Sequence, residues 1–264
     1  MLRTDAREQI LQELARRMKQ VEVGARPPAA HPSFSTGIPA LDGLLRRASV
    51  PGSIPAESAP LSNPLGGLVP GTLTEWLAAG SGSGAAWLAL RVAVNLQQRV
   101  EDEGGAQSLV FIDHRHEFYP PAAAALGLDL GQVLVIRPPR PAEGLWALEQ
   151  SLRSPAVAAT ICRVEMPGDR TLRRLQLAAE VGGGVGFLLR PARAAREACW
   201  ADARLRVQAL PAVEGDRRLR LEVLHLRGGI DGGTLELEID DETGSVRVVS
   251  ALASATAVLR TARA

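Results

Sequence analysis

Several residue types are scarce in this chain of 264 residues, and each scarcity excludes a class of protein. Aromatic residues make up 3% of the chain, so aliphatic side chains must fill its interior. Two cysteines are too few for a disulfide framework or for a zinc site built on cysteine. The four histidines show no spacing that would bring them together as metal ligands on one helix. We therefore expect neither a disulfide scaffold nor a bound metal.

An excess of one charge is also missing. The chain has 30 Lys and Arg against 29 Asp and Glu, and Lys19 is its only lysine. This balance gives no global attraction to nucleic acid or to a membrane surface, although it leaves local basic patches open. No signal-peptide pattern opens the chain, and no apolar run reaches the ~20 residues of a membrane span. The expected location is the cytoplasm, with no membrane partner.

The first part of the chain is predicted to form an amphipathic helix over residues 5–23. The Pro- and Gly-rich stretch GARPPAAHP at 24–32 ends this helix. We therefore assign 1–32 to an N-terminal helix and linker, and 33–264 to a core domain. The apolar face of the helix packs on its own domain, or it docks on a partner protein or a second subunit. The candidate protein-binding residues on this face recur at helical spacing: Leu11, Leu14, Met18 and Val21.

From the strand-like run TLTEWLA onward, apolar runs alternate with helical patterns as far as residue 190. Near-continuous apolar runs are typical of a parallel sheet that helices cover on both faces. After residue 203 most strand-like runs alternate apolar with charged residues, which is typical of antiparallel strands with one solvated face. The predicted fold class is α/β: a mostly parallel central sheet flanked by helices, plus C-terminal antiparallel strands. The Ser- and Pro-rich residues 47–64 are predicted to form a flexible surface insert.

A glycine-rich stretch, AAGSGSGAAW, lies between a predicted strand and a predicted helix. Phosphate-binding loops occupy this position and have the form GxxxxGK[ST], in which the lysine neutralises phosphate and the hydroxyl holds Mg²⁺. Aligned on Gly84, the chain has Ala79 at the first glycine, Ala85 at the lysine and Ala86 at the hydroxyl. The sequence therefore predicts a degenerate phosphate loop without nucleotide chemistry. Its residues are Gly80, Ser81, Gly82, Ser83, Gly84, Ala85 and Ala86.

Three stretches in order resemble the RecA-like superfamily: FSTGIPALDGLL, GGLVPGTLTEWLAAGSGSG and SLVFIDHRHEFYPPAAAALGLDL. The resemblance implies a RecA-like core. In that superfamily a glutamate after the second strand orients the attacking water, and here Arg115 stands at that position. Glu117 nearby is a shifted alternative for that glutamate. The acidic residue expected at the end of the next core strand, which would bind Mg²⁺ through water, falls on Arg163, with Glu165 nearby as its shifted alternative. Because phosphoryl transfer needs these parts together, we predict a pseudo-ATPase with no enzymatic activity and no cofactor.

The same resemblance implies DNA-facing loops near residues 163–170 and 190–202. Arginines can bind a single-stranded backbone, and an aromatic side chain can stack on a base. The alternative interpretation of the second segment is a helix with a solvated face. The candidate DNA-binding residues there are Arg190, Arg193, Arg196 and Trp200.

Within the superfamily, the chain looks most like the ImuA family of inducible-mutagenesis accessory proteins. The resemblance rests on LGGLVPGTLTEWL, EFYPPAAAALGLDL, VIRPPRPAEGLWALEQSLRSPAVAA and ELEIDDETG. It implies a non-catalytic adaptor in damage-induced (SOS) translesion DNA synthesis and mutagenesis. The implied partners are an inactive Y-family polymerase homologue and an error-prone replicative-type polymerase. Binding to RecA, self-association through the N-terminal helix and direct DNA contact stay open.

Two other functions remain as alternatives. One is a SulA-type cell-division inhibitor of the damage response, which is also a binding protein. The other is an ATP-dependent, recombinase-like ATPase that binds DNA. That enzyme would need a lysine at position 85 and a glutamate at position 115, and both are absent.

Overall fold

The structure is a computed structural model that describes residues 33–46, 66–102, 107–213, 216–240 and 243–252. The predicted N-terminal helix with its apolar residues, the linker that follows it and the predicted insert at 47–64 all lie outside the described residues.

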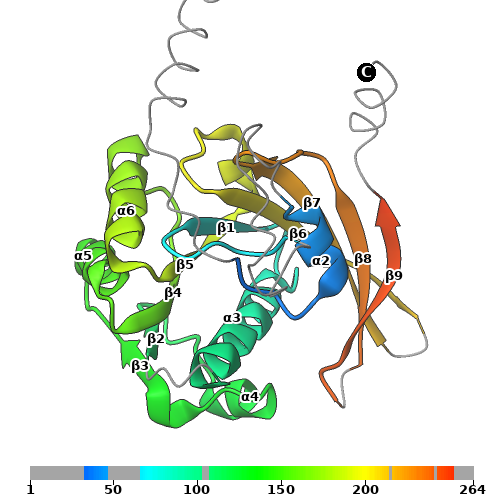
Figure 1. Ribbon diagram of the computed structural model, residues 1–264, viewed down its shortest axis with the longest axis horizontal. Helices are drawn as coiled ribbons and strands as arrows, with labels where there is room; N and C mark the ends of the chain where they lie inside the picture. The colour runs from blue at the N-terminus through cyan, green and yellow to red at the C-terminus, as the bar shows by residue number, and fades with distance from the viewer. Residues whose placement is uncertain (1–32, 47–65, 103–106, 214–215, 241–242, 253–264) are drawn as a thin grey trace, which may run out of the picture. The chain divides into compact units, whose positions relative to one another are not determined.

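The described residues build a nine-stranded sheet with the order β3-β2-β4-β5-β1-β6-β7-β8-β9 (Figure 1). The strands from β3 to β6 pair in parallel, and β7, β8 and β9 continue the sheet with antiparallel pairs. This confirms the predicted α/β fold class. The strands are β1 Leu73–Ala78, β2 Ser108–Ile112, β3 Val133–Ile136, β4 Val157–Arg163, β5 Val185–Pro191, β6 Ala203–Val213, β7 Asp216–Leu226, β8 Thr234–Ile239 and β9 Val246–Leu252.

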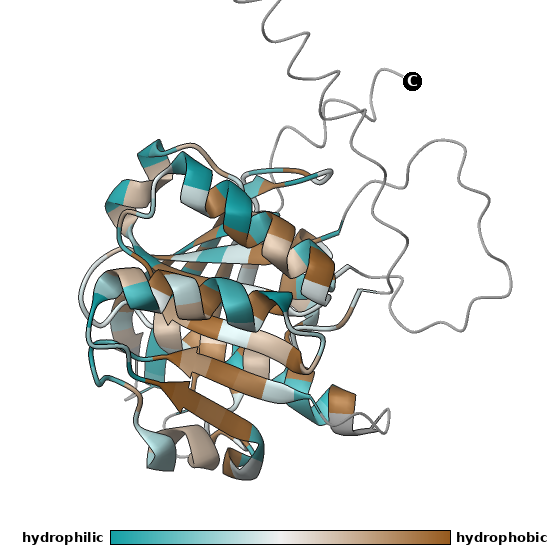
Figure 2. Cartoon of the chain, turned by 90° about the vertical axis from the view of Figure 1, so that its left-hand side faces the viewer, coloured by the Kyte–Doolittle hydropathy of each residue, from teal (hydrophilic) through white to brown (hydrophobic). Residues whose placement is uncertain are grey.

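Helices cover both faces of the parallel part, because its central strands are apolar on both sides. On one face α3 packs over Trp76, Phe187 and Leu205. On the other face α5 and α6 pack over Leu73 and Leu188, and Figure 2 shows these two helices side by side in front of the strands. The helices are α2 Pro39–Leu44, α3 Ala85–Asp102, α4 Pro120–Ala125, α5 Pro141–Arg153 and α6 Asp169–Gly182, with 3₁₀ turns η1 Leu130–Gln132 and η2 Ala192–Arg196.

Strand β6 differs from the expectation of an antiparallel strand with one wet face. It pairs in parallel with β1 on one side and antiparallel with β7 on the other. Its first residues, Ala203 to Leu205, are all buried, including Arg204. The alternation of Arg with apolar residues predicted a solvated face, but at this point the sheet still has covered faces on both sides.

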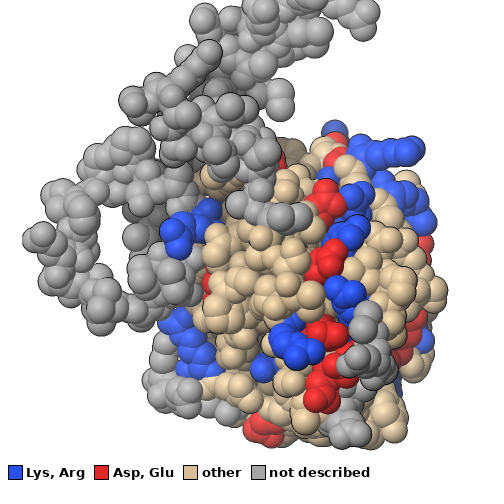
Figure 3. Space-filling model, turned by 90° about the vertical axis from the view of Figure 1, so that its right-hand side faces the viewer, with Lys and Arg blue, Asp and Glu red and all other residues tan. Residues whose placement is uncertain are grey.

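The antiparallel strands do have the expected solvated face. Their charged side chains form ion pairs across neighbouring strands, and Figure 3 shows positive and negative groups close together along this side of the molecule. Such cross-strand pairs support the register of the sheet. The pairs are Arg206 with Glu222, Arg218 and Arg220 with Glu236, and Arg247 with Glu238.

The stretch FSTGIPALDGLL is held by one buried carboxylate. Asp42 accepts hydrogen bonds from the backbone N and the hydroxyl of Thr36, at 2.8 and 2.7 Å. It also accepts one from the hydroxyl of Ser35 at 2.5 Å. Because a buried carboxylate must be hydrogen-bonded, these donors fix the turn that leads into α2. This serine, threonine and aspartate pattern therefore has a structural purpose.

Candidate functional site

The glycine-rich loop lies where the parallel strands end, between β1 and α3. Gly84 has φ of +81°, and a Cβ added there would lie 2.7 Å from both δ carbons of Leu219 on β7. Its carbonyl accepts the hydrogen bond from the backbone N of Leu88 that opens α3, at 2.9 Å. A side chain at this position would meet both an unfavourable backbone conformation and a steric clash. Gly84 is therefore needed for the sharp turn and for the close approach of β7.

The rest of the loop offers backbone groups and hydroxyls, but no charge. Ala85, at the position of the phosphate-loop lysine, is buried in the core that α3 covers, and Ala86 is exposed. The hydroxyl of Ser83 is buried and lies 3.4 Å from the backbone N of Ala85, while Gly80 and Ser81 are exposed. The loop presents N–H groups near a helix N-terminus, and such groups in general favour anions weakly.

At the same carboxyl edge of the parallel strands, side chains at or just after the ends of β2, β4 and β5 form a chain of ion pairs. Glu117 lies 2.9 Å from Arg163 and 3.4 Å from Arg115. Glu165 lies 3.5 Å from Arg115 and 3.2 Å from Arg193. Each glutamate thus lies between two guanidinium groups. We call these five residues the edge ion-pair chain; with three arginines and two glutamates it carries a formal charge of +1.

The edge ion-pair chain occupies both glutamates that the sequence offered as shifted catalytic substitutes. The carboxylate of each one interacts with two arginines in this arrangement. Within the part of the chain that the structure describes, no group of three or more His, Cys, Asp or Glu side chains is placed to hold a metal ion. The sequence named Arg115, Arg163, Glu117 and Glu165 one by one, but it did not predict their pairing.

Asp113 immediately follows β2 and positions the turn that leads to Glu117. Its carboxylate accepts hydrogen bonds from the backbone N of Glu117 at 2.8 Å and of Phe118 at 3.3 Å. It also forms an ion pair with Arg137, which follows β3, at 3.3 Å. The turn includes His116 in the left-handed region, with φ of +56°. The aspartate at the end of β2 therefore fixes the backbone that carries Glu117.

Arg190 was predicted to contact DNA, and this prediction is wrong because its side chain is fully buried. It donates to Glu75 on the neighbouring strand β1, with an N–O distance of 2.7 Å, and it also pairs with Glu197. Arg204 on β6 donates to the other oxygen of Glu75 at 2.5 Å. A buried carboxylate needs such partners. We call Glu75, Arg190, Glu197 and Arg204 the buried charge cluster.

The other predicted DNA contacts are distributed differently. Arg193 and Arg196 are exposed on the turn η2, which is a 3₁₀ turn and not the helix that was considered for this segment. Trp200 is half-buried and packs at the rim of the core under α5 and α6. The guanidinium carbon of Arg173 lies 5.3 Å from the centre of its ring. The structure therefore brings two of the four side chains to the surface, while Trp200 already stacks within the protein.

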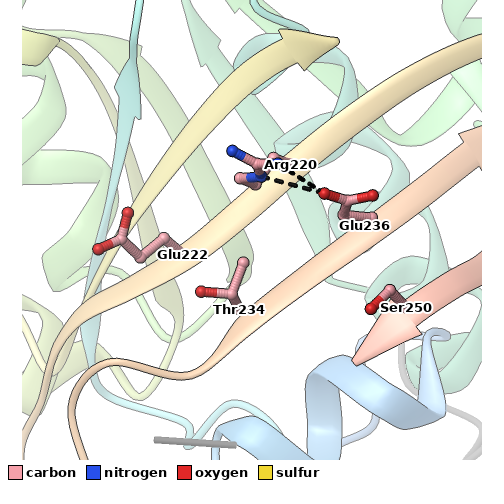
Figure 4. Close-up of a pocket in the computed structure, with 5 residues that line it drawn as sticks. All are labelled: Arg220, Glu222, Thr234, Glu236 and Ser250. Carbon is pink, nitrogen blue, oxygen red and sulfur yellow. Dashed lines mark hydrogen bonds and ion pairs between the residues drawn. The ribbon is translucent and has the colours of Figure 1, made fainter. Parts of the chain in front are cut away.

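A pocket lies elsewhere, on the solvated face of the antiparallel strands (Figure 4). Its most prominent groups, Arg220 and Glu236, bond to each other at 2.7 Å. The remaining lining residues are Glu222, Thr234 and Ser250. Arg220, Glu222 and Glu236 take part in the cross-strand ion pairs described above, and the glycine-rich loop contributes no residue to the lining.

The fold and this edge define an α/β protein with a strand, glycine loop and helix unit whose neighbouring charges are paired with one another. No protein-family model matches the chain. The sequence is 29% identical over 233 residues to Protein ImuA of Caulobacter vibrioides, in each of two strains, NA1000 / CB15N and ATCC 19089 / CIP 103742 / CB 15. This similarity covers 81% of the chain and 85% of that protein. No helix in the described residues is long and apolar enough to cross a membrane.

Proposed function

We propose that this chain is a RecA-like, non-catalytic accessory protein in damage-induced (SOS) mutagenesis and translesion DNA synthesis. The observation that carries the proposal is the similarity to Protein ImuA, because it extends over most of both chains and is not confined to one motif. The order β3-β2-β4-β5-β1 with the glycine loop after β1 supports a RecA-like core. The proposed location is the cytoplasm, where the chromosome is copied.

The proposal of a pseudo-ATPase rests on what lies around the glycine loop. Phosphoryl transfer needs a cation at the phosphates, a held Mg²⁺ and a group that orients the nucleophile. At the position where a phosphate loop has its lysine, this chain has Ala85, whose methyl group is buried. Arg115 stands where the water-orienting glutamate is expected, and Glu117 is paired with Arg163. These observations favour a scaffold that binds proteins over an ATPase.

The proposed partners are an inactive Y-family polymerase homologue and an error-prone replicative-type polymerase. They come from the family resemblance described above. In such an assembly this chain would act as an adaptor that brings the other two proteins together at damaged DNA.

A genetic experiment tests the biological role. We expect deletion of the gene to reduce ultraviolet-induced mutation to rifampicin resistance, while spontaneous mutation stays the same. The wild-type gene and a Gly80→Ala variant should both restore induced mutation, because Gly80 is exposed and an added Cβ meets no atom within 4 Å. Induced mutation that is unaffected by the deletion would contradict the proposed function.

A biochemical experiment tests the absence of catalysis. Phosphate release from Mg-ATP by purified protein should equal the buffer blank, with and without single-stranded DNA. The diagnostic variant is Gly82→Asp, because Gly82 is exposed, has φ of +70° and has open space around it. Aspartate tolerates this conformation better than most residues, so the fold should survive while a carboxylate repels phosphate. Turnover that this variant abolishes would overturn the pseudo-ATPase proposal.

A further inference from the structure

Helices α5 and α6 lie next to each other on one side of the sheet, and no other described element covers their outward sides (Figure 2). Three large apolar side chains are exposed there: Trp146 at 64%, Leu177 at 42% and Val181 at 68% of their full areas. The inner side of α6 is already buried through other residues, among them Leu172 and Leu175. Helix α6 therefore has an inner apolar side that packs on the sheet and a second apolar strip that faces outward.

The outward strip of α6 has regular spacing. Arg170, Arg174, Leu177 and Val181 follow one another at intervals of four, three and four residues, so they share one side of the helix. The apolar pair thus lies in line with two exposed arginines. Arg170 makes no ion pair with any described residue.

Between the two helices, two arginines share one carboxylate. Glu149 of α5 binds Arg153 through one oxygen at 2.9 Å and Arg174 of α6 through the other. Glu149 is nearly buried, whereas the two guanidinium groups are half-exposed or more. One carboxylate cannot neutralise two guanidinium groups, so these three side chains together carry a formal charge of +1, and Arg174 precedes Leu177 by three residues on α6. We call Trp146, Arg153, Arg170, Arg174, Leu177 and Val181 the α5–α6 surface.

We propose that the α5–α6 surface docks an amphipathic helix of a partner protein that carries acidic side chains beside its apolar ones. A helix fits because the strip is straight and has the periodicity of a helical ridge. Acidic side chains fit because the uncompensated guanidinium groups border the exposed apolar residues. The inference rests on the proposed function and deepens it, since it places the inactive polymerase homologue on this surface.

A nucleic acid would fit the same surface less well. Arginine and tryptophan suit a phosphate backbone and a base. Leu177 and Val181 add nothing to phosphate binding, and Glu149 places a carboxylate among the arginines. The combination of aliphatic, aromatic and arginine side chains is that of protein interfaces, in which tryptophan and arginine often dominate the binding energy.

Binding of the purified inactive polymerase homologue to the full chain, measured by calorimetry, tests the proposal. The variants are Trp146→Ala, Leu177→Glu and Arg170→Glu, with circular dichroism to check folding. Each variant should weaken binding about 10-fold or more. The matched control is Ile230→Glu, which also places a carboxylate at an exposed apolar residue, 52% exposed, outside the α5–α6 surface. The control should bind like the wild type, and wild-type binding should weaken as the salt concentration rises.

Each other result overturns the proposal in a distinguishable way. Wild-type affinity in all three variants would remove the surface but leave the proposed function intact. No binding by the wild-type chain would overturn both. Self-association of the wild type that Leu177→Glu abolishes, with polymerase binding unchanged, would make this surface a contact between two copies. Binding of single-stranded DNA that only Trp146→Ala and Arg170→Glu weaken would assign the surface to nucleic acid.

Discussion

Replacing Glu75 with glutamine is predicted to cost much of the stability of this fold. Glu75 and Arg190 are fully buried at their side chains, and Arg204 is nearly so. The carboxylate of Glu75 accepts from both arginines, at 2.7 and 2.5 Å. Glutamine has nearly the same shape, so no cavity forms. The substitution removes the negative charge and turns an NH₂ group toward one of the guanidinium donors.

The size of the stability loss depends on the contacts that Arg190 and Arg204 retain after the substitution. Removing one partner of a buried ion pair typically costs 3–5 kcal/mol, because a buried charge is left uncompensated. Arg190 would keep Glu197, and Arg204 would keep the carbonyls of Glu197 and Ala198, at 2.9 and 3.1 Å. These remaining contacts place the expected cost at the lower end of that range, about 3 kcal/mol. For a chain of this size, that loss lowers the melting temperature by about 6–12 °C.

The assay compares thermal unfolding of the wild type, Glu75→Gln and a matched Glu143→Gln. Glu143 also pairs with an arginine, Arg140, but on the surface of α5. A surface pair contributes about 0–1 kcal/mol, so this control should melt close to the wild type. Equal melting temperatures for Glu75→Gln and Glu143→Gln would refute the argument, since they would mean that the buried charge cluster leaves no charge uncompensated when Glu75 is neutralised.

Three further predictions concern the loop and two titratable groups. Gly84→Ala should lower the free energy of unfolding by about 1–3 kcal/mol, because position 84 has a positive φ and an added Cβ is crowded there. A urea titration should show this as a lower midpoint, whereas Gly80→Ala should leave the midpoint nearly unchanged. Burial acts to raise the pKa of Glu149, but hydrogen bonds from two arginines outweigh this effect and lower the pKa. The difference in unfolding free energy between wild type and Glu149→Gln should therefore be fully present at pH 7 and should fade as the pH falls below about 4. Burial raises the pKa of Cys162 to about 12 and that of Cys199 to about 11. Both thiols should therefore react slowly with a thiol reagent at pH 8 and rapidly in denaturant. Fast reaction of the native protein would contradict this prediction.

The parallel part of the fold was predictable because its signal is local. Each strand from β1 to β5 is a short apolar run, and each of the first four is followed by a helical pattern, so the alternation alone favours a covered parallel sheet. The position of β6 was not predictable in this way. Its alternating arginines indicate a solvated face, but Arg204 is buried by pairing with Glu75, which lies 129 positions earlier in the chain. No spacing rule connects residues so far apart.

The candidate site shows the same limit. The sequence identifies the glycine-rich loop and the alanines at positions 85 and 86, because these depend on positions next to each other. It misses the edge ion-pair chain, since Glu117 and Arg163 are 46 positions apart and meet only when β2 and β4 pair. It also assigns Arg190 to a DNA-facing loop, because the RecA-like resemblance implies such a loop near residues 190–202. Only the fold shows that a buried glutamate lies beside it.

Parts of the stretches that carry the family resemblance are held by contacts that need no ligand. Asp42 binds Ser35 and Thr36, and Gln97 exchanges hydrogen bonds with the backbone of Asp129 at 2.9 and 3.2 Å. Gly84 makes room for β7. Such contacts would be required in a protein of this fold whether or not it bound a nucleotide. Likeness in these stretches is therefore evidence for the architecture, whereas the proposed function rests on the similarity along most of the chain and on the surfaces that the fold leaves uncovered.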